Sequence, residues 1–414
     1  MSLPDKDRDV LRSLVEQQAA IASLPVHREK AELWRRLNRL EPTRPLVWIN
    51  EICWNEMDYE DELTLVTTDP WARGQELGLR RMLYQWRHLP GDMVVDDYMS
   101  SPYVAHSTGF GISEKADIVR TDETSGTISR QFHPQLVEPG DIEKIRTPEV
   151  TYDADATQAS YERMCAVYGD ILPVRQVGRK NWWFAPWDLL IRWWGVEDAM
   201  MDLAVRPDMV HKAVARLVDA YMAELDQIIE LDMLTLNNDN TRIGSGGYGY
   251  IDELPEPTAD YGPARTQDMW GCATAQIFSE VSPEMHWEFA LQYEAKWLER
   301  WGLTYYGCCE PLDIKVDVLK RIPNLRKLSM SAWIDAERAV ANVGTDYVMS
   351  RKPNPAVFAT DEWQPEVARR ELLEFLEVAD GCRVELILKD ISTVRYDPQR
   401  LWDWETIAME VAGA

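Results

Sequence analysis

The sequence has few histidines and few basic residues, and each shortage argues against a class of function. The six histidines form neither an HExxH motif nor a closely spaced pair, so a histidine-rich metal site is not expected. Only 44 lysines and arginines face 70 acidic residues, and the net charge of −26 would repel nucleic-acid phosphates and anionic lipids. We therefore expect neither nucleic acid nor a membrane as a partner.

Long apolar runs, regularly spaced cysteines, a P-loop and a serine-hydrolase motif are missing as well. No apolar stretch approaches the roughly 18 residues of a membrane span, and the charged first residues show no signal-peptide pattern. The six cysteines contain no CxxC pair, which favours free thiols in a reducing cytoplasm. The glycine-rich stretch 244–250 lacks the P-loop order, and no GxSxG motif occurs.

The pattern along the chain is an alternation of short apolar segments with helices. Eight strands are predicted, at 44–50, 92–95, 172–177, 232–236, 304–310, 325–330, 345–350 and 384–388. Helices are predicted at 7–40 (two), 70–88, 155–168, 188–203, 207–230, 282–301, 314–319, 334–340, 364–379 and 398–411. Asp69 before Pro70, and Ser282 before Pro283, have the pattern of helix N-caps.

This alternation is typical of a (β/α)8 TIM barrel, and no linker divides the chain. We expect one barrel domain over residues 1–414, with a helical N-terminal cap at 1–40 and an insertion at 100–150. Alternating polar and apolar residues at 126–132 predict a small hairpin in that insertion. A doubly wound open sheet is the structural alternative, although it would usually carry a GxGxxG turn after its first strand.

Polar side chains follow almost every predicted strand, where a barrel places its active site. They are Glu51, Asn55, Asp96, Asp97, Gln176, Arg179, Asn237, Asp239, Cys309, Glu310, Ser331, Arg351, Asn354, Lys389 and Asp390. Thiols beside a carboxylate, as at 308–310, suit a zinc-class metal. Alternatively, these cysteines are small core residues, and alternation along a strand would let only one of them face a site.

Four stretches resemble the uroporphyrinogen decarboxylase-like superfamily, which implies a (β/α)8 barrel. They are residues 187–211, 278–284, 302–309 and 330–335, and the resemblance extends over about 170–414. The decarboxylases of this superfamily bind their polycarboxylate with arginines after the first strand. Here residues 48–54 contain no arginine, and Glu51 and Glu56 would repel such a substrate.

The sequence is more similar to the other branch, the corrinoid-linked methyltransferases. These hold zinc with a His-x-Cys motif on the fifth strand and a later cysteine. Cys309 matches the cysteine of that motif, Gly307 stands at the histidine, and Lys389-Asp390 fall near the later cysteine. The resemblance implies a zinc-dependent methyltransferase that moves a methyl group between a small methylated substrate and a cobalamin (corrinoid) protein. Glu310 is a further residue able to complete the ligand set.

From this resemblance we assign candidate roles to individual residues. The metal ligands are Cys309, Cys308, Glu280 and Asp390; the catalytic residues are Asp97, Asp239, Asn237 and Arg351; the substrate-binding residues are Trp54, Trp183, Tyr248 and Asn354. The aromatic run 182–187 and the glycine-rich loop 244–250 would help to close the site, the latter as a close-approach or lid loop.

Two other functions are open at this point. One is a metal-free decarboxylase or lyase with Asp97 and Arg351 in the charge-handling roles. The other is a non-catalytic barrel that binds a tetrapyrrole or corrinoid partner. The oligomeric state is open too, with a homodimer as one alternative to a monomer.

Overall fold

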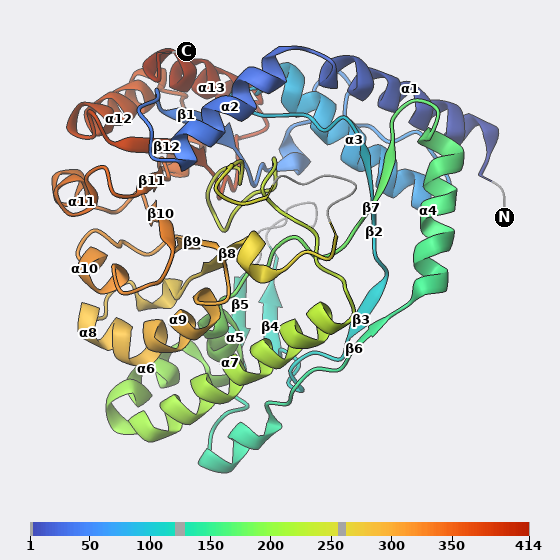
Figure 1. Cartoon of the computed structure of the whole chain (residues 1–414). Coiled ribbons are helices and arrows are strands. Elements are labelled where there is room, and N and C mark those ends of the chain that lie inside the picture. Colours follow the sequence, from blue (N-terminus) through green and yellow to red (C-terminus); the bar gives the residue numbers. More distant parts are fainter. Residues whose placement is uncertain (1–2, 121–128, 256–261, 414) are drawn as a thin grey trace.

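A parallel sheet of six strands organises the structure (Figure 1), a computed structural model that describes residues 3–120, 129–255 and 262–413. Each strand hydrogen-bonds to its neighbour in parallel register, so the carboxyl ends of all six lie along one edge. Their order is β1 (Leu46–Ile49), β12 (Arg383–Leu388), β11 (Val348–Arg351), β10 (Leu325–Met330), β9 (Leu303–Tyr306) and β8 (Trp270–Ala273).

Helices connect these strands and cover the outer face of the sheet (Figure 1). Because both faces are covered, nearly every strand residue is buried, as in other parallel sheets. The connecting helices are α8 (Pro283–His286), a π-helical turn η5 (Trp287–Leu291), α9 (Gln292–Leu298), α10 (Val316–Leu319), α11 (Ala336–Val343) and α12 (Pro365–Val378), and α13 (Gln399–Val411) follows the last strand. Ser282 caps α8 as predicted, accepting a hydrogen bond from the backbone N–H of Met285.

The rest of the predicted strand pattern is only partly realised. Strand β7 (Val174–Val177) pairs in parallel with β2 (Met99–Pro102), and a single bridge joins Arg179 to Leu234. The strands expected at 92–95 and 232–236 are not regular strands in the described part of the chain. The physical reason is that asparagine side chains take the hydrogen bonds that a ladder would use, for example from Asn237 to the carbonyl of Trp270.

The N-terminal helices match the expected cap: α1 (Asp5–Ala22) and α2 (Val26–Asn38). In α3 (Pro70–His88), Asp69 accepts from the N–H groups of Trp71 and Ala72, which confirms that predicted N-cap. The helix expected at 188–203 is instead two helices, α5 (Pro186–Trp194) and α6 (Val196–Val205). Gly195 separates them with a φ of 87°, which no α-helical residue adopts.

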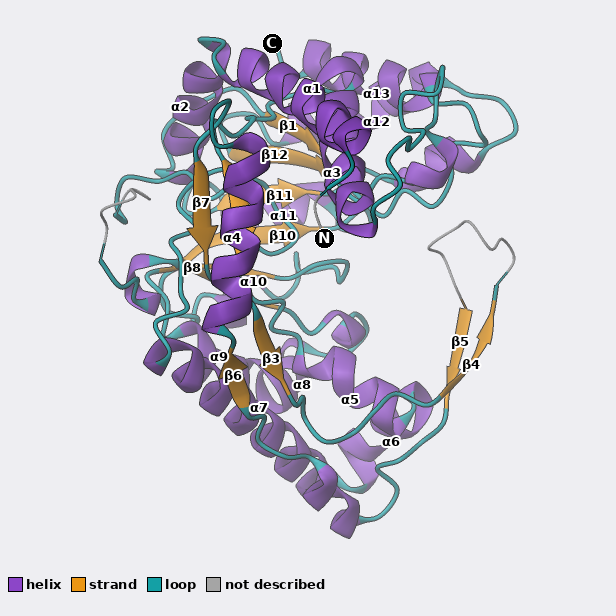
Figure 2. Ribbon diagram, turned by 90° about the vertical axis from the view of Figure 1, so that its right-hand side faces the viewer, coloured by secondary structure: helices purple, strands orange, loops and turns teal. Residues whose placement is uncertain are grey.

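The remaining helices and strands belong mainly to the insertion and its flanks. They are α4 (Ala154–Tyr168), α7 (Pro207–Glu230), η1 (Trp54–Glu56), η2 (Pro139–Lys144), η3 (Thr266–Asp268), η4 (Gln276–Phe278), η6 (Pro355–Ala359), β3 (Ala105–Ser107), β4 (Ala116–Val119), β5 (Ser129–Phe132) and β6 (Val150–Tyr152). The hairpin β4–β5 projects from the body (Figure 2) and agrees with the predicted hairpin, of which residues 126–128 lie outside the described residues.

The glycine-rich loop 244–250 is packed inside the sheet's concave face rather than lying over it as a lid. The N–H of Gly247 donates to Glu385 Oε1 at 2.9 Å, and a Cβ at Gly247 would lie 2.4 Å from the ring of Trp34. The loop therefore requires glycine for close approach, which was one of the two expected roles. Among the described residues, no helix combines the length and low polarity needed to cross a lipid bilayer.

Candidate functional site

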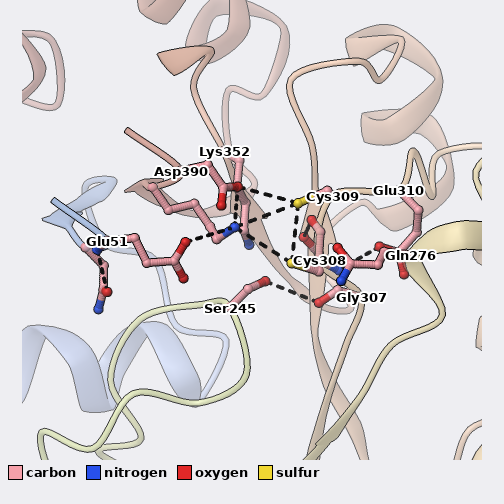
Figure 3. Close-up of polar contacts among 12 residues, drawn as sticks. Glu51, Ser245, Gln276, Gly307, Cys308, Cys309, Glu310, Lys352 and Asp390 are labelled. Atoms are coloured by element: carbon pink, nitrogen blue, oxygen red, sulfur yellow. Dashed lines mark hydrogen bonds and ion pairs between the residues drawn. The ribbon is translucent and has the colours of Figure 1, made fainter. Parts of the chain in front are cut away.

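Side chains from the ends of β9, β12 and β1 meet at the carboxyl edge of the sheet, and Figure 3 shows Cys308, Cys309, Asp390 and Glu51 near one another. We call them the thiol–lysine cluster: Cys308, Cys309, Lys389, Asp390 and Glu51. The Nζ atom of Lys389 lies 3.8 Å from each thiol sulfur, 3.4 Å from Glu51 Oε2 and in direct contact with Asp390 Oδ2. The two sulfurs are 3.5 Å apart, and Cys309 Sγ lies 3.5 Å from Asp390 Oδ2.

Sharp turns after β9, β12 and β1 direct these side chains toward one point. Gly307, Asp390 and Glu51 have φ values of 98°, 57° and 53°. For the two acidic residues this is an uncommon left-handed conformation, which proteins tend to keep at functional sites. Alternation along a strand would have let only one of the two cysteines face a site, but the turn at Gly307 lies before both of them. The chain has left β9 before Cys308, so both thiols can face the cluster.

The groups of the cluster shift one another's pKa values in different directions. The hydrogen bond from Cys309 lowers the pKa of Cys308 below its usual value, against burial, and the charge of Lys389 acts in the same direction. The pKa of Cys309 is raised, because it donates to Cys308 and is partly buried. Burial opposes the charge of Lys389, but the thiols and carboxylates around it outweigh burial and raise its pKa. The arrangement therefore stabilises the thiolate form of Cys308 relative to that of Cys309, and the charged form of Lys389 beside it.

Buried polar groups hold the thiol-bearing turn in place from below. Glu310 accepts from the N–H of Cys308 at 2.9 Å and from the hydroxyl of Thr274 at 2.9 Å. Ser329 donates to the carbonyl of Cys308 at 2.6 Å. Glu310 is fully buried, and burial raises its pKa. We therefore assign Glu310 to the support of the turn and not to ligand binding.

A cavity of about 390 Å³, which we call the mouth pocket, opens beside the cluster. Cys309, Lys389 and Asp390 form one side of it, and Asn354 lines another. The indole of Trp333 stands at its rim with 73% of the residue exposed. The pocket has room for a small molecule in contact with a thiol, an ammonium and a carboxylate.

Lys352 also lines the mouth pocket and was not singled out from the sequence as a site residue. Its ammonium donates to the hydroxyl of Tyr305 at 2.5 Å and to the hydroxyl of Ser350 at 2.7 Å. Burial lowers its pKa to about 7. In the sequence, Lys352 is marked only by its position directly after β11. It stands next to Arg351, which we predicted as a catalytic residue.

A second, larger cavity of about 1400 Å³ lies at the less regular side of the molecule. Four of the residues that line it form what we call the aspartate–lysine cluster: Asp96, Tyr98, Lys180 and Asp239. Lys180 Nζ lies 2.6 Å from Asp239 Oδ2 and 3.3 Å from the hydroxyl of Tyr98. Burial, with the nearby charge of Asp239, raises the pKa of Asp96 to about 6. Asp97 lines the same cavity, but its side chain is 75% exposed.

Two of the four expected catalytic residues have structural contacts instead. Asn237 is fully buried; its amide donates to the carbonyls of Lys180 and Trp270 and accepts from the N–H of Trp270. Arg351 is buried between the carbonyl of Ser331 and the carboxylate of Glu371. Neither side chain lines either cavity, because its polar atoms are already used to join neighbouring segments.

Three of the expected substrate-binding residues and one expected metal ligand also lie elsewhere. Tyr248 is buried against Trp34 and Trp48. Trp54 packs edge-to-face on Tyr84, and the indole N–H of Trp183 donates to Asp188. Glu280 is exposed, whereas the thiols of Cys308 and Cys309 contact Lys389, and that of Cys309 also contacts Asp390. Of the expected substrate-binding residues and metal ligands, Asn354, Cys308, Cys309 and Asp390 therefore lie near the mouth pocket.

The residues present do not fit the zinc ion that the family resemblance implies. Within residues 3–120, 129–255 and 262–413, no three or more His, Cys, Asp or Glu side chains are spaced to hold a metal ion. At position 307 a ligand side chain would be strained, because φ is 98° and a Cβ there would lie 2.4 Å from Leu312 Cδ1. Finally, the ammonium of Lys389 stands between the thiols and the carboxylates.

Comparison with known proteins supports the fold. No protein-family profile matches the sequence, and no curated protein matches it. Among solved structures, a methyltransferase from Methanosarcina mazei superposes with a TM-score of 0.51, over 93% of this chain and 98% of its own, at 12% sequence identity. At that identity the likeness shows a shared α/β fold, in agreement with the parallel sheet.

Proposed function

We propose that the protein transfers a methyl group between a small methylated substrate and a corrinoid carried by a partner protein. The observation that supports it most is the thiol–lysine cluster at the wall of the mouth pocket, at the carboxyl edge of the sheet. In barrel enzymes that edge carries the active site. The similarity of fold to a methyltransferase agrees with this function.

The proposal includes the (β/α)8 barrel as the full architecture. The six paired strands would form most of the barrel, and the irregular segments 92–95 and 232–236 would complete its eight strands. The bond of Asn240 to the carbonyl of Val94 and the bonds of Asn237 to Trp270 in β8 support this closure.

The chain's own residues would bind and orient the substrate in the mouth pocket. Asn354 lines it, and the exposed face of Trp333 can stack on a flat group at its rim. Cys309, which is exposed to the pocket, would contact the atom that carries the methyl group. The corrinoid would supply the nucleophile that accepts the methyl group, or the methyl donor in the reverse direction. The open rim at Trp333 leaves room for a partner to present it.

The test is a methyl-transfer assay with a corrinoid acceptor and a panel of methoxyaromatics, methylamines, methanol and methylated thiols. We expect Cys309→Ser to lower kcat/KM by about 10²-fold or more, since it replaces the polarizable thiol at the reacting atoms by a hydroxyl. Cys165→Ser is the matched control, because that thiol lies on α4 outside the mouth pocket. No turnover across the panel would contradict the proposal. Partner binding that survives Cys309→Ala, without turnover, would favour the non-catalytic barrel.

A second candidate is a metal-free decarboxylase or lyase acting on an aromatic acid in the larger cavity. The aspartate–lysine cluster favours it, because a cation beside two carboxylates is a common arrangement for handling charge and protons. Asp96, Lys180 and Asp239 would take the roles first assigned to Asp97 and Arg351. Release of CO₂ from aromatic acids that is lost in Asp239→Asn, and kept in Cys309→Ser, would select this function.

A further inference from the structure

We infer that the ammonium group of Lys389, and not a metal ion, is the electrophilic centre of the mouth pocket, and that the protein works there without bound zinc. The role of Lys389 in the reaction rests on the proposed methyl transfer. Whether the pocket binds zinc does not depend on that proposal and can be tested separately. It starts from the contacts of Lys389, which reach every other member of the thiol–lysine cluster.

The ammonium lies where the ligand atoms converge. It is held from β9 by the two thiols, from the turn after β1 by Glu51 and from its own turn by Asp390. The sulfur–sulfur distance of 3.5 Å is close to the roughly 3.8 Å that two zinc–sulfur bonds at a tetrahedral angle would give. The sulfurs are thus spaced almost as metal ligands are, but the cation between them and the carboxylates belongs to the chain.

The surrounding residues keep Lys389 in this position. Only 4% of its side chain is exposed, so its charge cannot be solvated and needs the cluster as counter-ion. Glu51 is itself held by Arg242, whose Nη1 lies 2.8 Å from Glu51 Oε1. Withdrawing the ammonium to admit zinc would leave a buried charge without partners. The nearby ligands would then be the two thiols, Asp390 and Glu51, and Glu51 is already paired with Arg242.

In the proposed reaction Lys389 would act on the heteroatom that loses the methyl group. The bond between the methyl carbon and the oxygen or nitrogen breaks, and its electron pair stays on the heteroatom. The methyl group passes to the nucleophile of the partner. An N–H of Lys389 donates a hydrogen bond to the charge that develops on the heteroatom, as a metal ion would stabilise it elsewhere. Lys389 lines the mouth pocket, so this contact is within reach of a bound substrate.

Zinc retention tests the inference without any activity measurement. The whole chain would be equilibrated with excess zinc sulfate, passed through a desalting column and measured by elemental mass spectrometry. We expect wild type to retain no stoichiometric zinc and Lys389→Cys, which adds a third thiol, to retain one equivalent. One equivalent retained by wild type and lost in Cys309→Ser would overturn the inference. If Lys389→Cys does not fold, Lys389→Met, which keeps the apolar stem of the side chain, is measured in its place. The zinc content of wild type then still decides the test.

A chelator experiment tests the role in the reaction. Treatment with dipicolinate should leave methyl transfer by wild type unchanged, whereas Lys389→Met should lower kcat by about 10²–10³-fold, as for the loss of one transition-state donor. Lys389→Arg should restore part of the rate, because it keeps a charged N–H donor. Activity abolished by the chelator and restored by zinc would overturn the inference. If no substrate turns over, the proposed function fails, while the zinc-retention result stands independently.

Discussion

Two sides of the molecule are held together by different chemistry. In the ladder wall, formed by β1 and β8–β12, backbone N–H and carbonyl groups pair with one another. In the amide wall, formed by residues 92–95 and 232–250, asparagine side chains make many of the hydrogen bonds to backbone groups. Asn237 and Asn238 bond to carbonyls around β8, Asn240 to that of Val94, and Asn38 reaches in from α2 to Tyr248.

The comparison shows how a chain can keep buried backbone groups satisfied without a regular strand. Each asparagine amide offers two donors and an acceptor, so one side chain can satisfy groups of two neighbouring segments. The two walls also differ in what they present. The ladder wall ends in the thiol–lysine cluster, and the amide wall borders the larger cavity with its aspartate–lysine cluster.

The largest expected effect comes from a buried ion pair inside the ladder wall. Lys327 Nζ and Glu385 Oε2 are 2.9 Å apart, with no exposure of either side chain. Lys327→Met should lower the free energy of unfolding by about 3–5 kcal/mol, because it leaves the Glu385 charge buried and unpaired. Urea unfolding followed by tryptophan fluorescence measures it. The double variant Lys327→Met/Glu385→Leu should recover much of the loss; a single variant as stable as wild type would contradict the prediction.

Asn237→Ala tests the amide wall directly. It should cost about 1–3 kcal/mol of unfolding free energy, because the buried N–H and carbonyl of Trp270 lose their partner. The same urea experiment applies, with Asn342→Ala on the outer helix α11, where the amide makes one bond to the carbonyl of Asp313, as the matched control. Equal costs in the two variants would mean that the amide wall does not depend on Asn237.

A pH series tests a buried carboxyl packed against the ladder wall, that of Glu294 on α9, which accepts a hydrogen bond from the hydroxyl of Tyr306 in β9. Burial raises the pKa of Glu294 from 4.5 to about 8 in the folded protein. The folded state therefore keeps its proton where the unfolded chain has lost it. This contribution to stability is present in full below about pH 4.5 and is lost as pH rises toward about 8. Glu294→Gln should show a flatter dependence of unfolding free energy on pH; parallel curves would refute the assignment.

The smallest expected effect is that of Asn240→Ala. Its amide donates a partly buried hydrogen bond to the carbonyl of Val94 at 3.1 Å, and its side chain also bonds the carboxyl of Asp96. Loss of these partly buried bonds should cost about 0.5–1.5 kcal/mol, less than the change at Asn237, where fully buried groups lose their partner. The comparison of the two variants by urea unfolding ranks the asparagines of the amide wall. A larger loss at Asn240 would reverse that ranking.

Local patterns predicted the elements whose signals lie within a few residues. Strand β10 has its expected bounds, Leu325–Met330, and Asp69 caps α3 as its sequence indicates. The missed strand β8, Trp270–Ala273, contains a glycine and an alanine and has little strand propensity of its own. It is a strand because Leu303–Tyr306 pairs with it, which is a tertiary effect.

The candidate site could be predicted only in part for a similar reason. A position after a strand indicated Cys308, Cys309 and Asp390, and the structure brings them together. The same argument also selected Arg351 and Asn237, whose polar atoms are used by buried neighbours. Nothing local distinguishes a polar residue that points into a pocket from one that is satisfied by the backbone, since both follow a strand.

The sequence by itself determined the alternation of strands and helices, the acidic surface and the pair of thiols at the end of one strand. These follow from periodicity, composition and turn residues close together in the chain. Only the tertiary structure decided what the thiols face. Strands β9 and β12 are separated by two others in the sheet, and the curvature of the sheet brings Lys389 to within 3.8 Å of both sulfurs. Contacts across a curved sheet depend on how all its strands pack, and no local pattern records them.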